Sequence, residues 1–300
     1  MANARRLVDL FQKEDPSRLP FTVAIPSYND IYTWENGQFA DYLERYVTVI
    51  DPPVLSLDYY PIGLPGYTDE HQLDDSLVWC DLGLMRLLGR KYQMPLWFYY
   101  LGNNLHNYSH FDFPMVREQM YAAALYGCKA LQHFTVVDTV ITDDGKRGRF
   151  FEQQQQIHRE FKKLGNTLMA LENRFVFHSD DLLPNAPFFA GLADNIAESA
   201  VFSAPLPTRV SAGELCDAYG NVYVMILNRD FTVPKTVSLP LKKTLRLYEV
   251  SRETGRQHLL CDATDRIDLT LAEGDAILLR VQDAKEDPFT VEYRLEKDPQ

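Results

Sequence analysis

The sequence predicts an α/β protein in which four parallel (β/α) units precede an antiparallel β-sandwich. Up to about residue 175, short apolar runs alternate with segments of helical periodicity. Beyond about residue 200, the pattern changes to short runs with period-two alternation, separated by turn residues. Because the early strands are apolar throughout, they are typical of parallel strands that are buried on both faces.

The predicted elements follow one another closely along the chain. Leu7, Leu10 and Phe11 share one face of the first helix, which ends before Pro16. The predicted helices cover residues 4–13, 38–46, 77–92, 113–126 and 148–173, and the predicted strands cover residues 21–26, 53–61, 95–102 and 131–134. We therefore divide the chain into residues 1–178 with the (β/α) units, a connector at 179–199, a β-sandwich at 200–283 and a polar tail at 284–300.

Composition excludes several classes of partner. Hydrophobic residues make up 46% of the 300 residues and charged residues 24%, as in an ordinary globular protein. The formal net charge is −12, and the basic cluster Lys146, Arg147 and Arg149 is short, so we expect no nucleic-acid partner. No apolar run reaches the roughly 18 residues of a membrane span, so we expect no membrane partner. The opening segment, MANARRLVDLF, does not look like a signal peptide, and the localisation stays open.

The sequence shows no pattern typical of a cofactor or metal site. The widely spaced cysteines form no Cys-x-x-Cys pair, and we interpret them as small buried hydrophobic residues: Cys80, Cys128, Cys216 and Cys261. No dinucleotide fingerprint, phosphate loop or zinc spacing occurs, so we expect no cofactor. His106 and His110 are four residues apart, as in some metal sites, but their segment lacks a helical pattern, so we expect no metal there.

Several segments resemble a known family. REQMYAAALYGCKALQHFTV, residues 117–136, resembles the last helix and eighth strand of (β/α)8-barrel glycoside hydrolases of the beta-galactosidase-like clan. VLSLDYYPIG and MPLWFYYLGN look like their sixth and seventh strands, and VMILNRDF and LAEGDAILLRV are similar to the β-sandwich that follows the barrel in many of them. The resemblance covers roughly residues 53–283 and implies a partial (β/α) barrel with strands five to eight.

The resemblance also implies that the usual pair of catalytic acids is missing from the chain as given. Such families carry an acid/base glutamate on strand four, which would precede this chain. They carry the nucleophile on strand seven, where this chain has FYYLGNN without a carboxylate. Retaining hydrolysis needs two carboxyl groups about 5–5.5 Å apart at the carboxyl ends of strands. The acids at such positions are Asp58, Asp30, Glu35 and Asp138, and Asp58 is either catalytic or a hydrogen-bond acceptor for a sugar hydroxyl or a neighbouring loop.

Aromatic and polar side chains gather at the predicted strand ends. Flat amphipathic rings suit sugar faces, although alternate strand residues must also pack against helices. The predicted substrate-binding residues are Tyr28, Trp34, Tyr59, Tyr60, Tyr99, Tyr100, Asn103, Asn104 and His133. Among them we favour Tyr60 and Tyr100, and we interpret His133 as either a hydrogen-bonding partner of the substrate or a core histidine.

Two functional hypotheses follow. The first is a glycoside hydrolase-like, carbohydrate-directed protein that acts in polysaccharide degradation by O-glycosyl hydrolysis only when the rest of the barrel is present. The second is a non-catalytic carbohydrate-binding or scaffold protein. Since four (β/α) units cannot close a barrel, we expect either self-association or pairing with a missing N-terminal half-barrel.

Overall fold

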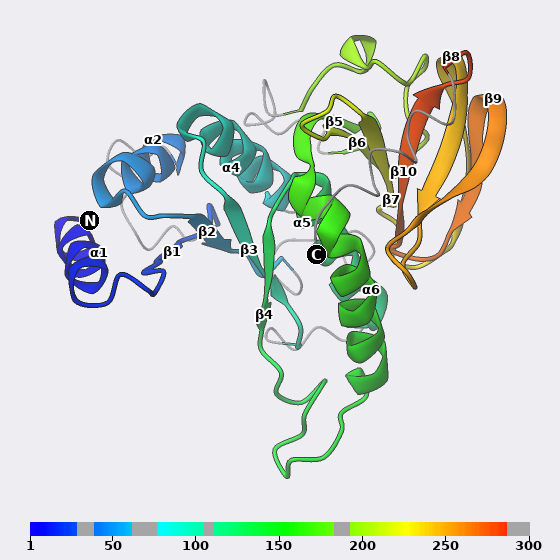
Figure 1. The fold of residues 1–300 in the computed structure, drawn as a ribbon. Coiled ribbons are helices and arrows are strands. Elements are labelled where there is room, and N and C mark those ends of the chain that lie inside the picture. The colour runs from blue at the N-terminus through cyan, green and yellow to red at the C-terminus, as the bar shows by residue number, and fades with distance from the viewer. Residues whose placement is uncertain (29–38, 62–76, 105–110, 183–192, 287–300) are drawn as a thin grey trace.

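The computed structural model describes residues 1–28, 39–61, 77–104, 111–182 and 193–286 (Figure 1). The first part alternates helices and strands, as predicted. Its elements are α1 (Ala2–Glu14), β1 (Val23–Ala24), α2 (Phe39–Arg45), the π-helical turn η2 (Tyr46–Ile50), β2 (Leu55–Asp58), α4 (Val78–Tyr92), β3 (Leu96–Leu101), α5 (Phe113–Leu125), β4 (Ala130–Phe134) and α6 (Phe151–Ala170).

The strands of this first part form a parallel sheet. Within the described residues the order is β1-β2-β3-β4, and each neighbouring pair is parallel, which confirms the prediction of four parallel strands. Leu57 pairs with Phe98, which pairs with Leu131, so the register runs straight across the sheet. The strand predicted at residues 21–26 is much shorter, because ladder bonds to β2 form only at Val23 and Ala24.

A second sheet is antiparallel and lies in the C-terminal part. Its strands are β5 (Glu172–His178), β6 (Val210–Cys216), β7 (Val222–Asn228), β8 (Lys235–Val250), β9 (Gln257–Leu271) and β10 (Ala276–Asp283), and the short 3-10 helix η3 (Ile196–Glu198) precedes β6. Across the described ranges they form an antiparallel sheet in the order β5-β6-β7-β10-β8-β9, which is consistent with the β-sandwich-like C-terminal part that was expected. Residues 172–178, which the sequence grouped with the (β/α) units, pair with β6 in this sheet.

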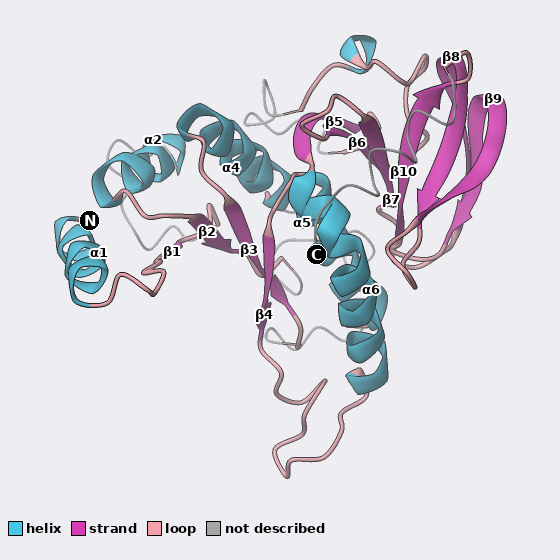
Figure 2. Cartoon of the chain, in the orientation of Figure 1, coloured by secondary structure: helices cyan, strands magenta, loops and turns pink. Residues whose placement is uncertain are grey.

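The two sheets share a helical layer. Helices α5 and α6 lie between them (Figure 2). Along β7, Tyr223, Met225 and Leu227 belong to the same apolar core as the helices and the parallel sheet, whereas Val224 and Ile226 point to a second core on the far face. This alternation follows from the period-two geometry of a strand, and it buries β7 on both faces. The antiparallel sheet therefore shares an apolar core with the helices and the parallel sheet.

A glycine allows the close contact between helix and sheet. A Cβ added at Gly213 of β6 would lie 3.0 Å from the carbonyl oxygen of Leu125, at the end of α5. The same carbonyl accepts a hydrogen bond of 2.6 Å from the side-chain amide of Asn173. Gly213 therefore permits an approach that a larger residue would obstruct.

Burial differs from expectation at the N-terminal helix. Leu7, Leu10 and Phe11 are exposed, and among the helix's residues Val8 faces the core. Three of the cysteines, Cys80, Cys128 and Cys216, are buried as predicted, and Cys261 is half-buried. The described helices include none with the length and apolar character that a bilayer crossing requires.

Candidate functional site

The two faces of the parallel sheet carry different chemistry. Leu57, Phe98 and Tyr100 face the helices and belong to the main core. Since successive side chains in a strand point to opposite faces, Asp58 and Tyr99 lie on the other face. Asp58 pairs with Tyr99, and Tyr99 with Gln132, so these side chains stand next to one another near the carboxyl ends of β2, β3 and β4. We call this the open face, because the described helices pack on the opposite side.

Asp58 is the carboxylate of the open face. Its Oδ2 accepts a hydrogen bond of 3.3 Å from the Tyr60 hydroxyl. Burial raises the pKa of Asp58, and the hydrogen bond from Tyr60 opposes that rise. Burial and the negative charge of Asp58 together raise the pKa of Tyr28 to about 12, which indicates that this phenol lies near the carboxylate. Asp58 is thus suited to accept hydrogen bonds, and its raised pKa favours proton exchange nearer to neutral pH.

Half-exposed aromatic rings share the open face with Asp58. Tyr60 stacks on Phe134 with centroids 4.6 Å apart, and Phe21 meets Trp97 edge-on at 5.0 Å. We call Phe21, Tyr60, Trp97, Tyr99 and Phe134 the open-face aromatic cluster. Sequence reasoning found Tyr60 and Tyr99 but missed Trp97 and Phe134, although both follow the period-two spacing of their strands.

Two polar residues complete the open face. The Ser56 hydroxyl donates a hydrogen bond of 3.1 Å to Oε1 of Gln132, across the intervening strand β3. Both residues were missed by the sequence analysis, because neither ends a strand. The Gln132 side chain thus adds an amide to the surface beside Tyr99.

A buried acid lies beneath the site. Asp81, in the first turn of α4, is 1% exposed and accepts a hydrogen bond of 2.9 Å from the backbone N–H of Ser27. Burial raises the pKa of Asp81 to about 7. Because it is enclosed, Asp81 cannot contact a substrate, but it fixes the segment after β1 that carries Tyr28. No sequence pattern indicates this role, because Asp81 lies inside a helix.

Tyr100 and His133 belong to the opposite, helix-covered face. Their rings stack with centroids 4.9 Å apart, and they are neighbours in the β3–β4 register. The Tyr100 hydroxyl lies 2.9 Å from Nε2 of His158 and accepts a hydrogen bond of 2.7 Å from the Gln154 amide. Burial lowers the pKa of His133 to about 4, so its ring is neutral. Tyr60 and Tyr100, the two favoured tyrosines, therefore do not line one pocket.

The remaining predicted residues are dispersed. Tyr59 is fully buried and meets Tyr28 edge-on at 4.9 Å. Asn103 follows β3 and is 7% exposed, and no donor in the described part of the chain reaches its Oδ1. Asn104 is half-buried, and Asp138 is exposed with a positive φ of 69°. Trp34, Asp30, Glu35, His106 and His110 lie outside the described residues.

The described residues offer no metal centre. Among residues 1–28, 39–61, 77–104, 111–182 and 193–286, no three His, Cys, Asp or Glu side chains gather closely enough to hold an ion. Asp58 has aromatic and amide neighbours on the open face. This arrangement can bind a hydroxyl-rich ligand by ring contact and hydrogen bonding, and it supplies one group for proton transfer.

Comparison with known proteins gives distant structural similarity. No family model matches the chain, and no curated protein matches it. The solved structures that resemble it include glycoside hydrolases. An Anoxybacillus α-amylase shares 8% identity at a TM-score of 0.48 over 93% of this chain and 56% of its own. A putative α-N-acetylgalactosaminidase from Bacillus halodurans shares 13% sequence identity at a TM-score of 0.44, and the match covers 93% of this chain and 61% of that protein. A β-L-arabinopyranosidase from Geobacillus stearothermophilus shares 10% identity at a TM-score of 0.30, and the match covers 83% of this chain and 62% of that protein.

These similarities are too distant to assign the chain to a family. The chain spans about three-fifths of the length of the solved structures it matches. These three TM-scores are below 0.5, so the similarities assign no function to the chain.

Proposed function

We propose that this protein is carbohydrate-directed and glycoside hydrolase-like, with its sugar site on the open face of the parallel sheet. The observation that carries the proposal is the position of Asp58 among the half-exposed rings of the open-face aromatic cluster. Aromatic rings bury the apolar C–H surface of a sugar, and carboxylate and amide oxygens accept its hydroxyl protons. Gln132 and Asn103 add such polar groups near the same strand ends.

The proposal includes further (β/α) units that complete the barrel and supply a second carboxyl group. The four parallel strands described have two sheet edges, and a barrel requires the edges to meet. Hydrolysis also needs a second carboxyl group close to Asp58. We therefore propose that hydrolytic activity requires additional units, supplied by another half-barrel or by a second copy of the chain. The proposal also includes the resemblance to the beta-galactosidase-like clan and the partial (β/α) barrel. It keeps the predicted domain division, with a C-terminal β-sandwich.

A second function is favoured by one observation. Within the described ranges, Asp58 and Asp81 both lie near Tyr28. Asp81 is buried, so it cannot serve as a second carboxyl group for a substrate on the open face. An open face with one accessible carboxylate can bind sugar without cleaving it. The alternative is thus a non-catalytic carbohydrate-binding or scaffold protein.

One pair of assays distinguishes the two functions. The 300-residue chain is screened on a glycan array for binding and on chromogenic glycosides for hydrolysis. Binding without turnover is expected for both functions when the chain is alone. Turnover that appears on addition of a complementary half-barrel supports the hydrolase, and binding that stays without turnover supports the binding protein. Absence of sugar binding in every arm would refute both.

A further inference from the structure

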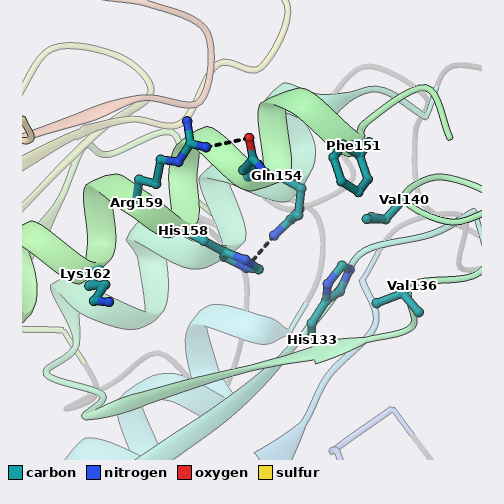
Figure 3. Close-up of a pocket in the computed structure, with 9 residues that line it drawn as sticks. His133, Val136, Val140, Phe151, Gln154, His158, Arg159 and Lys162 are labelled. Atoms are coloured by element: carbon teal, nitrogen blue, oxygen red, sulfur yellow. Dashed lines mark hydrogen bonds between the residues drawn. The ribbon is translucent and has the colours of Figure 1, made fainter. Parts of the chain in front are cut away.

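A cavity of about 370 Å³ lies between the end of β4 and the first turns of α6 (Figure 3). His133, Gln154 and His158 lie along its polar side, and Val136, Val140 and Phe151 along its apolar side. The cavity is on the helix-covered face of the sheet, on the opposite side from Asp58. Its volume falls in the range of small-molecule sites, about 300–1,000 Å³.

The polar side of the cavity is neutral. The Gln154 amide donates hydrogen bonds to the Tyr100 hydroxyl and to Nε2 of His158, each 2.7 Å long. Because Nε2 of His158 accepts this bond, the ring carries its proton on Nδ1. Burial lowers the pKa of both His133 and His158, so neither ring adds positive charge at neutral pH. This side therefore suits polar, uncharged contacts.

The rim of the cavity is cationic. Arg159 and Lys162 are three residues apart on α6 and both line the opening. Arg159 donates a hydrogen bond of 2.7 Å to Oε1 of Gln155, and no carboxylate in the described part of the chain pairs with either cation. The acids of the same helix are engaged elsewhere, since Glu152 pairs with Arg147 and Glu160 lies 3.8 Å from Arg252. Although the net charge of the chain is −12, these two cations have no acid partner among the described residues, so they are available to an anionic ligand.

We propose that this cavity binds a small organic carboxylate with an apolar body. The apolar wall of Val136, Val140 and Phe151 would contact the body, and Arg159 and Lys162 would hold the carboxylate at the rim. Arginine suits this task because its planar guanidinium matches the two oxygens of a carboxylate. A cationic ligand is disfavoured, because the described residues that line the cavity include no acid. The proposal does not depend on the sugar site of the open face.

The test compares two probes of equal shape. Calorimetry measures binding of 2-naphthoate and of 2-naphthamide to the full chain, and the naphthoate is expected to bind about tenfold more tightly, a difference of about 1.4 kcal/mol. Lys162→Gln and Arg159→Gln should each weaken naphthoate binding about three- to tenfold. Val136→Trp should block the cavity without disturbing the fold, because Val136 is exposed.

Lys163→Gln is the matched control, since it makes the same charge change on the same helix outside the lining. It should leave naphthoate binding unchanged. The proposal is overturned if naphthoate does not bind, if both probes bind equally, or if Lys163→Gln weakens binding as much as Lys162→Gln.

Discussion

The phenol ring of Tyr60 stacks on Phe134, with centroids 4.6 Å apart and ring planes inclined by 18°. The stack joins the segment after β2 to the end of β4, two strands that are separated by β3. The hydroxyl of the same tyrosine donates to Asp58. One side chain therefore holds both a ring and the carboxylate of the open face in position.

Removal of the Tyr60 hydroxyl should raise the pKa of Asp58. Burial already raises this pKa, and the hydrogen bond from Tyr60 stabilises the charged form. Tyr60→Phe keeps the ring stack and removes only the bond, so the pKa of Asp58 should rise further. Carboxyl-carbon NMR titration measures it, and Tyr99→Phe serves as the control. A lower pKa in Tyr60→Phe would contradict the hydrogen bond as drawn.

Asp81 should make the protein less stable as the pH rises from about 4 to 7. The folded state keeps the Asp81 proton up to about pH 7, whereas the unfolded chain releases it near its ordinary value of 3.8. Unfolding therefore releases a proton in this window, and the free energy of unfolding falls by at most about 1.4 kcal/mol per pH unit. Asp81→Asn should flatten this slope in urea titrations at pH 5 and pH 7.5. An unchanged slope would show that Asp81 is ionised when folded.

Gly102 should be needed for the position of His133. A Cβ added at Gly102 would lie 1.5 Å from Nε2 of His133, so the ring would have to leave its stack on Tyr100. We expect Gly102→Ala to destabilise the protein by about 1–3 kcal/mol. The clash disappears in Gly102→Ala/His133→Ala, so a double-mutant cycle in urea should show coupling between the two sites. Strict additivity of the two changes would contradict the contact.

A buried ion pair should fasten α4 to the antiparallel sheet. Arg86, 3% exposed, lies 2.7 Å from the carboxylate of Asp194 and donates a hydrogen bond of 2.7 Å to the carbonyl of Arg174 in β5. Arg86→Met leaves Asp194 without its cation, and should cost about 3 kcal/mol of unfolding free energy. The matched control is Lys91→Met on the same helix, whose pair with Glu44 is exposed and should contribute less than about 1 kcal/mol. Equal losses in the two variants would refute the assignment.

The sequence predicted the parallel sheet well, because its strands are apolar throughout and each is followed by a helix. It did not predict which strand residues share a face, since that depends on the register of β2 against β3. Asp58 pairs with Tyr99, so Tyr60 and Tyr100 lie on opposite faces. A single sequence shows how side chains alternate between the two faces within each strand, but it does not show the register in which two strands pair.

The second sheet has two features that the sequence did not predict. Strand β5 begins two residues after α6 ends, so the predicted helix at 148–173 overlapped its start and residues 172–178 were grouped with the (β/α) units. Strand β8 contains Pro240, and its pairing with β9 shifts register directly after that proline. Both features depend on contacts with distant parts of the chain.

The most direct test of the carbohydrate proposal is calorimetric titration of galactosides and glucosides into three proteins: the unaltered chain, Tyr60→Ala and Tyr100→Phe. Tyr60 belongs to the open-face aromatic cluster, whereas Tyr100 lies on the opposite face. We predict that the unaltered chain binds, that Tyr60→Ala weakens binding about tenfold through loss of ring contact, and that Tyr100→Phe leaves it unchanged. Binding that is indifferent to Tyr60→Ala, or that is lost in Tyr100→Phe while the fold persists by circular dichroism, would contradict a sugar site on the open face.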